Sequence, residues 1–275
     1  MGAGVASQRL GQDLGVGQGP VFHHGSFDAA VLSRGRGGVT VSVCIPARNE
    51  ERTVAGVAGP VHEALTARGG GVDLVDELIV VDDGSTDATA SRAEAAGAVV
   101  VPSGSAGGGK GLAMRAGLAA TTGDLVVFLD ADVTDFAPHF VVGLLGPLMA
   151  APGMGLVKGF YERPLHRGEG GGRVTELVAR PAIDLLFPEL GHIRQPLAGE
   201  TALRRGALGA IELEPGYGVE LGLLVDMAEA HGTAAIAQVD LGVRAHRNRP
   251  LVELRPHATD VLRAALRRAG AVIAT

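Results

Sequence analysis

The feature that most constrains the fold is a regular alternation of short apolar runs and helical segments between residues 39 and 132. The apolar runs cover residues 39–45, 77–81, 98–101 and 124–129. The segments between them have the capping residues and length of helices, at about 48–67, 86–96 and 112–120. A β-α-β-α-β-α-β order predicts a parallel sheet, because each helix returns the chain to the same end of the sheet. We therefore expect an α/β protein.

Polar clusters follow these strands. They are the segment Pro46–Glu51, the segment Asp82–Asp87, a glycine-rich loop at 104–111 and the triplet Asp130-Ala131-Asp132. In open α/β sheets, ligands bind at the carboxyl ends of the strands. The position of these polar clusters, each directly after a predicted strand, therefore predicts a ligand site at the carboxyl ends of the strands.

Two of the clusters have a definite chemistry. Asp130 and Asp132, at positions i and i+2 after a buried strand, suit Mg²⁺, which takes oxygen ligands from carboxylates and substrate phosphates. A solvated turn or a helix cap is the plainer interpretation of such a pair. The loop at 104–111 fits the phosphate-binding pattern GxxxxGK, with Lys110 as its lysine, but Gly111 replaces the final Ser or Thr. A P-loop-like NTPase and a merely flexible loop are therefore both open alternatives.

Beyond residue 150 the pattern is looser. We expect a strand at 155–161, helices at 173–187 and 217–231, a strand at 234–239, and a terminal helix at 252–268 that is interrupted early, at Pro256. We divide the chain into a flexible N-terminal arm at 1–37, with a short packed piece around 21–32, a nucleotide-binding half at 38–150 and a second half at 151–275.

Composition excludes several classes of protein. The net charge of −6 and the scarcity of aromatic residues disfavour a nucleic-acid-binding protein. The uncharged run 140–157 contains glycines and prolines that predict a helix end, a turn and a strand, so we expect no membrane span. The N-terminus lacks the apolar region of a signal peptide, and the single cysteine, Cys44, forbids an internal disulfide. We expect a cytoplasmic protein with a buried, inert thiol.

Three runs in the second half are more specific than these general motifs. They are GGGRVTELVARP at 170–181, PGYGVE at 215–220 and VRAHRNRP at 243–250. Together with the earlier clusters they resemble the retaining glycosyltransferases of the GT-A fold, in particular the glucosyl-3-phosphoglycerate synthases of actinobacteria, over residues 39–268. The resemblance implies transfer of glucose from UDP-glucose to the 2-hydroxyl of 3-phosphoglycerate. It also implies Mg²⁺ or Mn²⁺ as the cofactor, and a homodimer.

The resemblance also implies roles for individual residues. The donor-binding residues would be Pro46, Ala47, Glu50, Gly84, Lys110, Asp130, Ala131, Leu197, Tyr217 and Arg249. The acceptor-binding residues would be Gly172, Arg173, Thr175 and Asn248. The metal ligands would be Asp132, His246 and Asp130, and the catalytic residues Glu220 and Lys110. Arg48 departs from the pattern, because an aliphatic residue is expected beside the nucleotide.

Residue chemistry is consistent with these roles. Lys110 and a metal ion can stabilise the charge that develops on a departing diphosphate. Arg173, next to a run of glycines, can grip a carboxylate or phosphate with two parallel hydrogen bonds. We expect Glu220 to position the sugar or acceptor for front-side attack, in preference to acting as a covalent nucleophile. Two further alternatives are a mannosyl-3-phosphoglycerate synthase that uses GDP-mannose and a nucleotide-sugar sensor without turnover.

Overall fold

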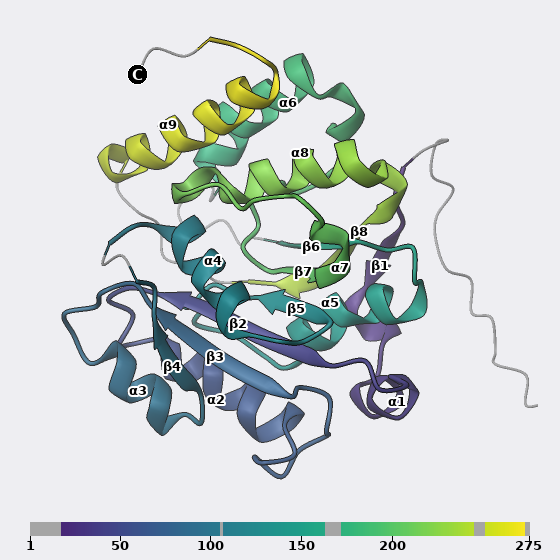
Figure 1. Ribbon diagram of the computed structural model, residues 1–275, viewed down its shortest axis with the longest axis vertical. Helices are drawn as coiled ribbons and strands as arrows, with labels where there is room; N and C mark the ends of the chain where they lie inside the picture. Colours follow the sequence, from purple (N-terminus) through teal and green to yellow (C-terminus); the bar gives the residue numbers. More distant parts are fainter. Residues whose placement is uncertain (1–17, 105–106, 163–171, 245–250, 273–275) are drawn as a thin grey trace, which may run out of the picture.

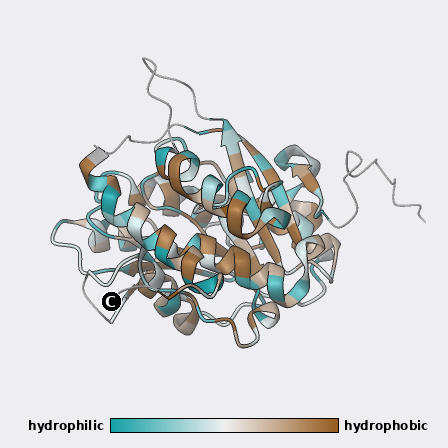
Figure 2. Cartoon of the chain, turned by 90° about the horizontal axis from the view of Figure 1, so that it is seen from above, coloured by the Kyte–Doolittle hydropathy of each residue, from teal (hydrophilic) through white to brown (hydrophobic). Residues whose placement is uncertain are grey.

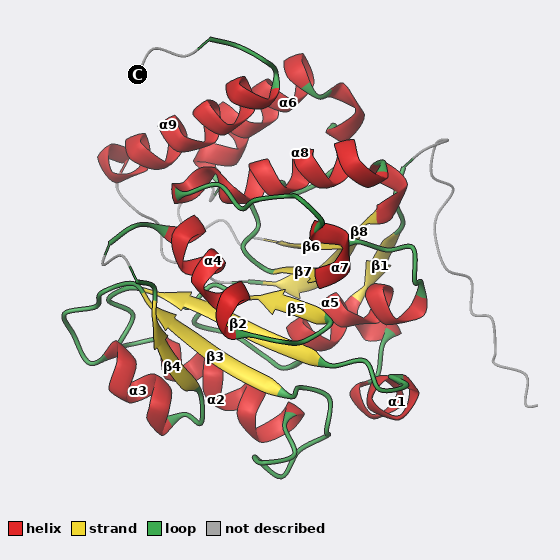
Figure 3. Cartoon of the chain, viewed as in Figure 1, coloured by secondary structure: helices red, strands yellow, loops and turns green. Residues whose placement is uncertain are grey.

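A computed structural model describes residues 18–104, 107–162, 172–244 and 251–272 of the chain (Figure 1). Its centre is one eight-stranded sheet in the order β1-β8-β6-β7-β5-β2-β3-β4. Helices cover both faces of this sheet, which gives three layers (Figure 3).

The first half has the predicted βα alternation. The parallel strands are β2 (Val41–Ala47), β3 (Glu77–Asp82), β4 (Val99–Pro102) and β5 (Leu125–Phe128). The helices are α2 (Val54–Leu65), α3 (Thr89–Ala95) and α4 (Lys110–Ala120). Both faces of β2 are buried, with Val43 and Ile45 in the core cluster that includes α2 and Cys44 in the cluster that includes α4. This burial explains why the strand is a continuous apolar run.

The second half adds three strands to the same sheet. They are β6 (Leu156–Glu162), β7 (Thr201–Arg204) and β8 (Ile236–Val243). Strand β7 is antiparallel to both β5 and β6, so the sheet is mixed, whereas the sequence predicted only parallel strands. Because β7 pairs with β5 of the first half and β6 of the second, it holds the two halves together in one sheet.

Part of the predicted flexible arm is ordered, which corrects its boundary at residue 37. Strand β1 (Val21–His23) pairs with β8, and a 3-10 turn (His24–Ser26) and α1 (Ala29–Gly35) follow it. This segment packs closely on the rest of the protein, since a Cβ on Gly146 would lie 2.2 Å from the ring of Phe27. The packed piece expected around 21–32 thus comprises β1, the 3-10 turn and α1, over residues 21–35.

The remaining helices complete the two outer layers. They are α5 (His139–Ala150), a π-helical turn (Thr175–Ala179), α6 (Arg180–Leu186), a 3-10 turn (Pro188–Leu190), α7 (Arg205–Leu208), a 3-10 turn (Gly216–Gly218), α8 (Val219–His231), a 3-10 turn (Thr233–Ala235) and α9 (Leu251–Arg268). Figure 2 shows helices that carry both hydrophobic (brown) and hydrophilic (teal) residues, as expected of helices with one face on a core. In α5, by contrast, every residue from Phe140 to Leu148 is buried. Within the described residues, no helix has both the length and the apolar character needed to cross a membrane.

Helix α9 corrects one prediction. The sequence predicted an early interruption at Pro256, but the helix continues through it. A proline removes one backbone hydrogen bond, here close to the start of the helix. Burial of Val261 and Ala265 in the core cluster that includes α4 and α8 offsets that loss.

Candidate active site

A cavity of about 420 Å³ lies at the carboxyl ends of β2, β3 and β5, where the sequence predicted a ligand site. Residues of both halves line it. From the predicted site it brings together Pro46, Ala47, Glu50, Lys110, Asp130, Ala131, Asp132, Gly172, Arg173, Thr175, Leu197, Tyr217 and Glu220. Gly84 is not among the lining residues; its neighbour Asp83 is. His246, Asn248 and Arg249 lie outside the described residues.

Hydrogen bonds connect two of the loops that border the cavity. The backbone N–H of Asn49 donates to Ser85 Oγ at 3.0 Å, and the side chain of Asn49 accepts from the N–H of Thr86 at 2.9 Å. Asn49 has a φ of +56°, in the left-handed region that asparagine tolerates. The N–H of Glu50 donates to Thr89 Oγ1 at 2.8 Å. The loop after β2 is thereby tied to the loop after β3.

Asp83 shapes the glycine-rich loop. Its carboxylate, which is buried, accepts from the backbone N–H groups of Gly108 and Gly109 at 3.2 and 3.1 Å and from Ser103 Oγ at 2.7 Å. Gly107 gives room to Arg48, because a Cβ there would lie 2.8 Å from the guanidinium. Arg48 lines the cavity at the position where an aliphatic residue was expected.

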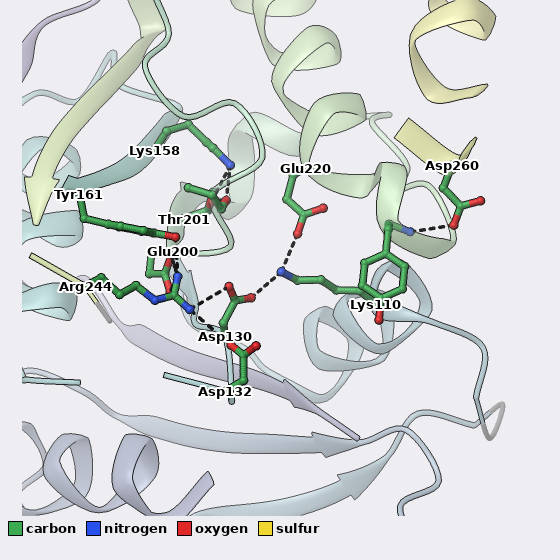
Figure 4. A network of polar contacts seen from close by, with 12 residues as sticks. Lys110, Asp130, Asp132, Lys158, Tyr161, Glu200, Thr201, Glu220, Arg244 and Asp260 are labelled. Carbon is green, nitrogen blue, oxygen red and sulfur yellow. Dashed lines mark hydrogen bonds and ion pairs between the residues drawn. The ribbon is translucent and has the colours of Figure 1, made fainter. Parts of the chain in front are cut away.

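A network of charged side chains forms the floor of the cavity (Figure 4). Lys110 Nζ lies 2.5 Å from Asp130 Oδ1 and 2.5 Å from Glu220 Oε1, so one cation joins the metal motif to the predicted catalytic carboxylate. Burial acts to lower the pKa of Lys110, but the charges of Asp130 and Glu220 outweigh it and hold that pKa well above its ordinary value. Lys110 is therefore a permanent positive charge.

Arg244 forms the second cationic centre of the network. Its guanidinium lies 2.7 Å from Glu200, donates to the Tyr161 hydroxyl at 2.6 Å, and lies 3.4 Å from both Asp130 and Asp132. Burial alone would raise the pKa of Asp130, but Lys110 and Arg244 hold it well below its usual range. Burial raises the pKa of Glu200, and Arg244 opposes that shift. The carboxylate of Asp130 is therefore ionised.

Lys158 lies behind the cavity, on β6. Its side chain is buried, and Nζ donates to the carbonyl of Ala198 at 2.6 Å and to Thr201 Oγ1 at 2.9 Å. These bonds hold the segment 198–201, which comes close to the metal motif: a Cβ on Gly199 would lie 2.1 Å from Asp130 Oδ1. Burial, with the nearby charge of Lys110, lowers the pKa of Lys158 to about 8.

Asp130 and Asp132 are arranged to share one cation. Both carboxylates approach the same nitrogen, Nη2 of Arg244, so their oxygens converge on one positive centre. Two carboxylates with this convergence fit a hard divalent ion such as Mg²⁺ or Mn²⁺. Among the described residues there is no group of three or more His, Cys, Asp or Glu side chains that could hold a metal, and the predicted third ligand, His246, lies outside them.

The residues expected to bind the acceptor, Gly172, Arg173 and Thr175, line one part of the cavity with Val174, at the start of the π-helical turn. Gly172 has a φ of +83°, a conformation that glycine adopts without strain. Leu254, His257 and Val261 of α9 line the cavity beside them.

Several residues of the site were not predicted. Arg244 falls inside the run 243–250 that carried the resemblance, and that position was the available signal. Glu200, Lys158, Tyr161 and His257 have no such signal. Tyr161 and His257 line the cavity, whereas Glu200 pairs with Arg244 and Lys158 lies behind the cavity. All four are brought there by strand pairings and helix contacts between distant segments.

Residues 42–159 match the family model described as "Glycosyl transferase family 2". That span runs from β2 into β6 and includes the glycine-rich loop and the Asp130-Ala131-Asp132 triplet. The fold and the site thus define a glycosyltransferase.

Relatives specify the class further. The chain is 51% identical to the glucosyl-3-phosphoglycerate synthase of Mycolicibacterium smegmatis, over 89% of this chain and 82% of that one. It is 45% identical to the corresponding synthase of Mycobacterium tuberculosis (strain CDC 1551 / Oshkosh), over 97% of this chain and 87% of that one. A crystal structure of the Mycobacterium tuberculosis synthase in complex with Mn²⁺, UDP-glucose and phosphoglyceric acid matches with a TM-score of 0.82 and 45% identity, over 92% of this chain and 88% of that chain. The chain belongs to the glucosyl-3-phosphoglycerate synthase family.

Proposed function

We propose that this enzyme transfers glucose from UDP-glucose to the 2-hydroxyl of 3-phosphoglycerate. The observation that carries the proposal is the single cavity that places the Asp130–Lys110–Glu220 network between the nucleotide loops and the Arg173 segment. Relatives that share about half of the residues over most of the chain bear the name of this activity. Solved complexes of the Mycobacterium tuberculosis synthase contain UDP-glucose with phosphoglyceric acid, or UDP with glucosyl-3-phosphoglycerate.

On the donor side, Pro46, Ala47 and Glu50 contact the uridine and Leu197 and Tyr217 the glucose. Asp130, Asp132 and His246 hold the divalent cation, which when bound supplies positive charge to the diphosphate. Lys110 adds a second, preorganised positive charge where negative charge develops on the leaving group. The raised pKa of Lys110 supports this role, because it keeps the side chain protonated.

We propose that the glucose retains its anomeric configuration. Glu220 is buried and paired with Lys110, which supports a positioning role: the pair fixes the carboxylate beside the sugar. In this scheme the acceptor hydroxyl attacks from the face that the diphosphate leaves. Arg173, Thr175, Gly172 and Asn248 hold the carboxylate and phosphate of 3-phosphoglycerate.

We also propose that two copies of the chain associate and that the reaction takes place in the cytoplasm. Exposed leucines support the association: Leu177, Leu185 and Leu186 are 71%, 81% and 36% exposed along the π-helical turn and α6. Uncovered apolar side chains of this size mark interaction surfaces. Light scattering should give the mass of a dimer for the wild type and of a monomer for Leu185→Glu.

A matrix of nucleotide sugars against 3-phosphoglycerate, with the product identified by mass, tests the reaction. We expect a hexosyl-3-phosphoglycerate from UDP-glucose and Mg²⁺, and none with chelator or with Asp132→Ala. Preferred use of GDP-mannose would replace the proposal with mannosyl transfer. Binding of UDP-glucose without UDP release would favour a sensor, and ATP hydrolysis lost in Lys110→Ala would favour the P-loop alternative.

A further inference from the structure

Helix α9 forms one wall of the substrate cavity. Leu254, His257 and Val261 line the cavity, and their spacing of three and four residues places them on one face of the helix. Leu254 also lines a smaller pocket together with Arg173 and Val174, and His257 stacks on Tyr217. In the proposed function, α9 therefore borders both the segment expected to hold the acceptor and the tyrosine expected to border the glucose.

One hydrogen bond and close packing at two glycines hold α9 against the Gly216–Gly218 turn. Asp260 Oδ2 accepts a hydrogen bond from the backbone N–H of Tyr217 at 3.1 Å (Figure 4). The glycines permit this approach, because a Cβ on Gly216 would lie 2.5 Å from Asp260 Oδ2 and one on Gly218 would lie 2.8 Å from Ala264 Cβ. The backbone of Tyr217 is thus fixed from α9.

The side chain of Tyr217 is fixed from the same helix. Its ring stacks on the imidazole of His257 with ring centroids 3.4 Å apart and planes 26° apart. Both side chains are half-buried and line the cavity. Glu220, three residues after Tyr217, lies in the first turn of α8 and pairs with Lys110. The stack therefore lies next to the group that positions the sugar.

We propose that His257 is a specificity-determining positioning residue, which rests on the proposed function: it holds the Tyr217 ring as a rigid wall of the hexose subsite. His257 acts through Tyr217, and its contribution is the planar stack. A ring held on one face by an aromatic partner and at its backbone by Asp260 has little freedom to adapt to a different hexose. A looser ring would bind glucose less well and discriminate less between hexoses.

Three variants test the proposal. His257→Leu keeps a similar volume but removes the ring, His257→Phe keeps a ring that can stack, and Thr259→Ala changes an exposed position of the same helix as a control. For His257→Leu we expect a roughly two- to thirteenfold higher KM for UDP-glucose, the range that corresponds to loss of one aromatic pair at about 0.5–1.5 kcal/mol. We also expect a smaller preference for UDP-glucose over UDP-galactose. The KM for 3-phosphoglycerate and the melting temperature should change little.

His257→Phe should restore the KM and the preference to within about twofold of the wild type, and Thr259→Ala should match the wild type. An unchanged KM and preference in His257→Leu would overturn the proposal, as would equal defects in His257→Phe and His257→Leu. Calorimetry of UDP-glucose binding to the same variants gives the answer without turnover. If the wild type bound UDP-glucose but made no product with 3-phosphoglycerate, the proposed function would fail while the role of His257 would still be tested.

Discussion

Lys110 and Lys158 are the two lysines of the chain, and both belong to the charged network of the site. Their electrostatic situations are opposite. Lys110 has two carboxylates at 2.5 Å, which outweigh its burial. Lys158 donates to a carbonyl and a hydroxyl, which carry no full negative charge. The lowering of its pKa by burial is therefore only partly offset. One site therefore contains a fixed cation and a titratable one.

Lys158 should titrate near pH 8. The pKa of about 8 lies below the ordinary value of 10.5, so between these values the folded state binds fewer protons than the unfolded state. The free energy of unfolding should accordingly gain a contribution as the pH rises through this window. ¹⁵N NMR of the lysine Nζ groups, assigned with Lys158→Arg, would follow both lysines. A Lys158 resonance that titrates at the ordinary value would contradict the buried geometry.

Replacing Arg173 should weaken binding of the acceptor and leave binding of the donor unchanged. Loss of a charge-assisted hydrogen bond costs about 1.5–3 kcal/mol, so Arg173→Ala should weaken binding of 3-phosphoglycerate by at least roughly tenfold per bond. Arg173→Lys should not restore it, because an ammonium lacks the planar fork of the guanidinium. Affinity for UDP-glucose should stay near that of the wild type. Calorimetry with each substrate would measure both effects, and equal losses for donor and acceptor would place the acceptor site elsewhere.

At the scale of elements, the contact between α4 and β2 positions Lys110. Helix α4 begins at Lys110 and lies directly on the strand, and a Cβ on Gly117 would lie 2.1 Å from the sulfur of Cys44. Cys44 is fully buried, and burial raises the pKa of its thiol to about 12, which fits the inert thiol expected from the sequence. Gly117 and Cys44 are therefore a packing pair.

Gly117→Ala should reduce the free energy of unfolding by about 1–3 kcal/mol, because overpacking outweighs the better helix propensity of alanine. Cys44→Ala removes the sulfur that the new methyl group would meet, so the double variant should be more stable than Gly117→Ala. Urea unfolding of the two single variants and the double variant measures this coupling. Strictly additive effects would show that the two residues do not pack on each other.

The sequence predicted those elements whose signal is local. Strands β2 to β6 and β8 are apolar runs, and α4 and α8 follow a glycine-rich loop and a Pro-Gly pair. Strand β7 was missed because Thr201–Arg204 is short and becomes a strand through antiparallel pairing with β5 and β6. The continuation of α9 through Pro256 was missed because tertiary packing outweighs one lost hydrogen bond.

The same distinction applies to the site. Motif positions such as Lys110, Asp130 and Glu220 could be predicted, and the structure brings them into one network. The pairing of Arg244 with Glu200 joins residues 44 positions apart in the chain, and only the folded sheet brings them together. The motif did not indicate which of two neighbouring residues borders the cavity: Asp83 lines it, whereas the predicted Gly84 is not among the lining residues.

At the scale of the whole molecule, one sheet runs through all three parts into which the sequence was divided. Strand β1 from the N-terminal part is next to β8, and β7 joins β6 of the second half to β5 of the first. His24 of the N-terminal segment contacts α5: its ring centroid lies 4.2 Å from that of His139 on α5 and 4.3 Å from that of the neighbouring His23. Three imidazoles and the nearby Asp240 thus meet where β1, β8 and α5 join.

This cluster should make the attachment of the N-terminal segment sensitive to acid. Burial lowers the pKa of His24 below its ordinary value of 6.5, the charges of His139 and His23 lower it further, and Asp240 opposes them. Below pH 6.5 the unfolded state then binds more protons than the folded state, so stability falls as the pH falls toward the folded pKa. His24→Phe keeps a ring in place but removes the titration, and should flatten the pH dependence. Urea unfolding between about pH 5 and 8, the range in which histidines titrate, would compare this variant with the wild type. His231→Gln, a change at an exposed histidine, is the control and should leave the pH dependence of stability unchanged. Equal slopes in all three proteins would show that His24 does not couple the N-terminal strand to proton binding.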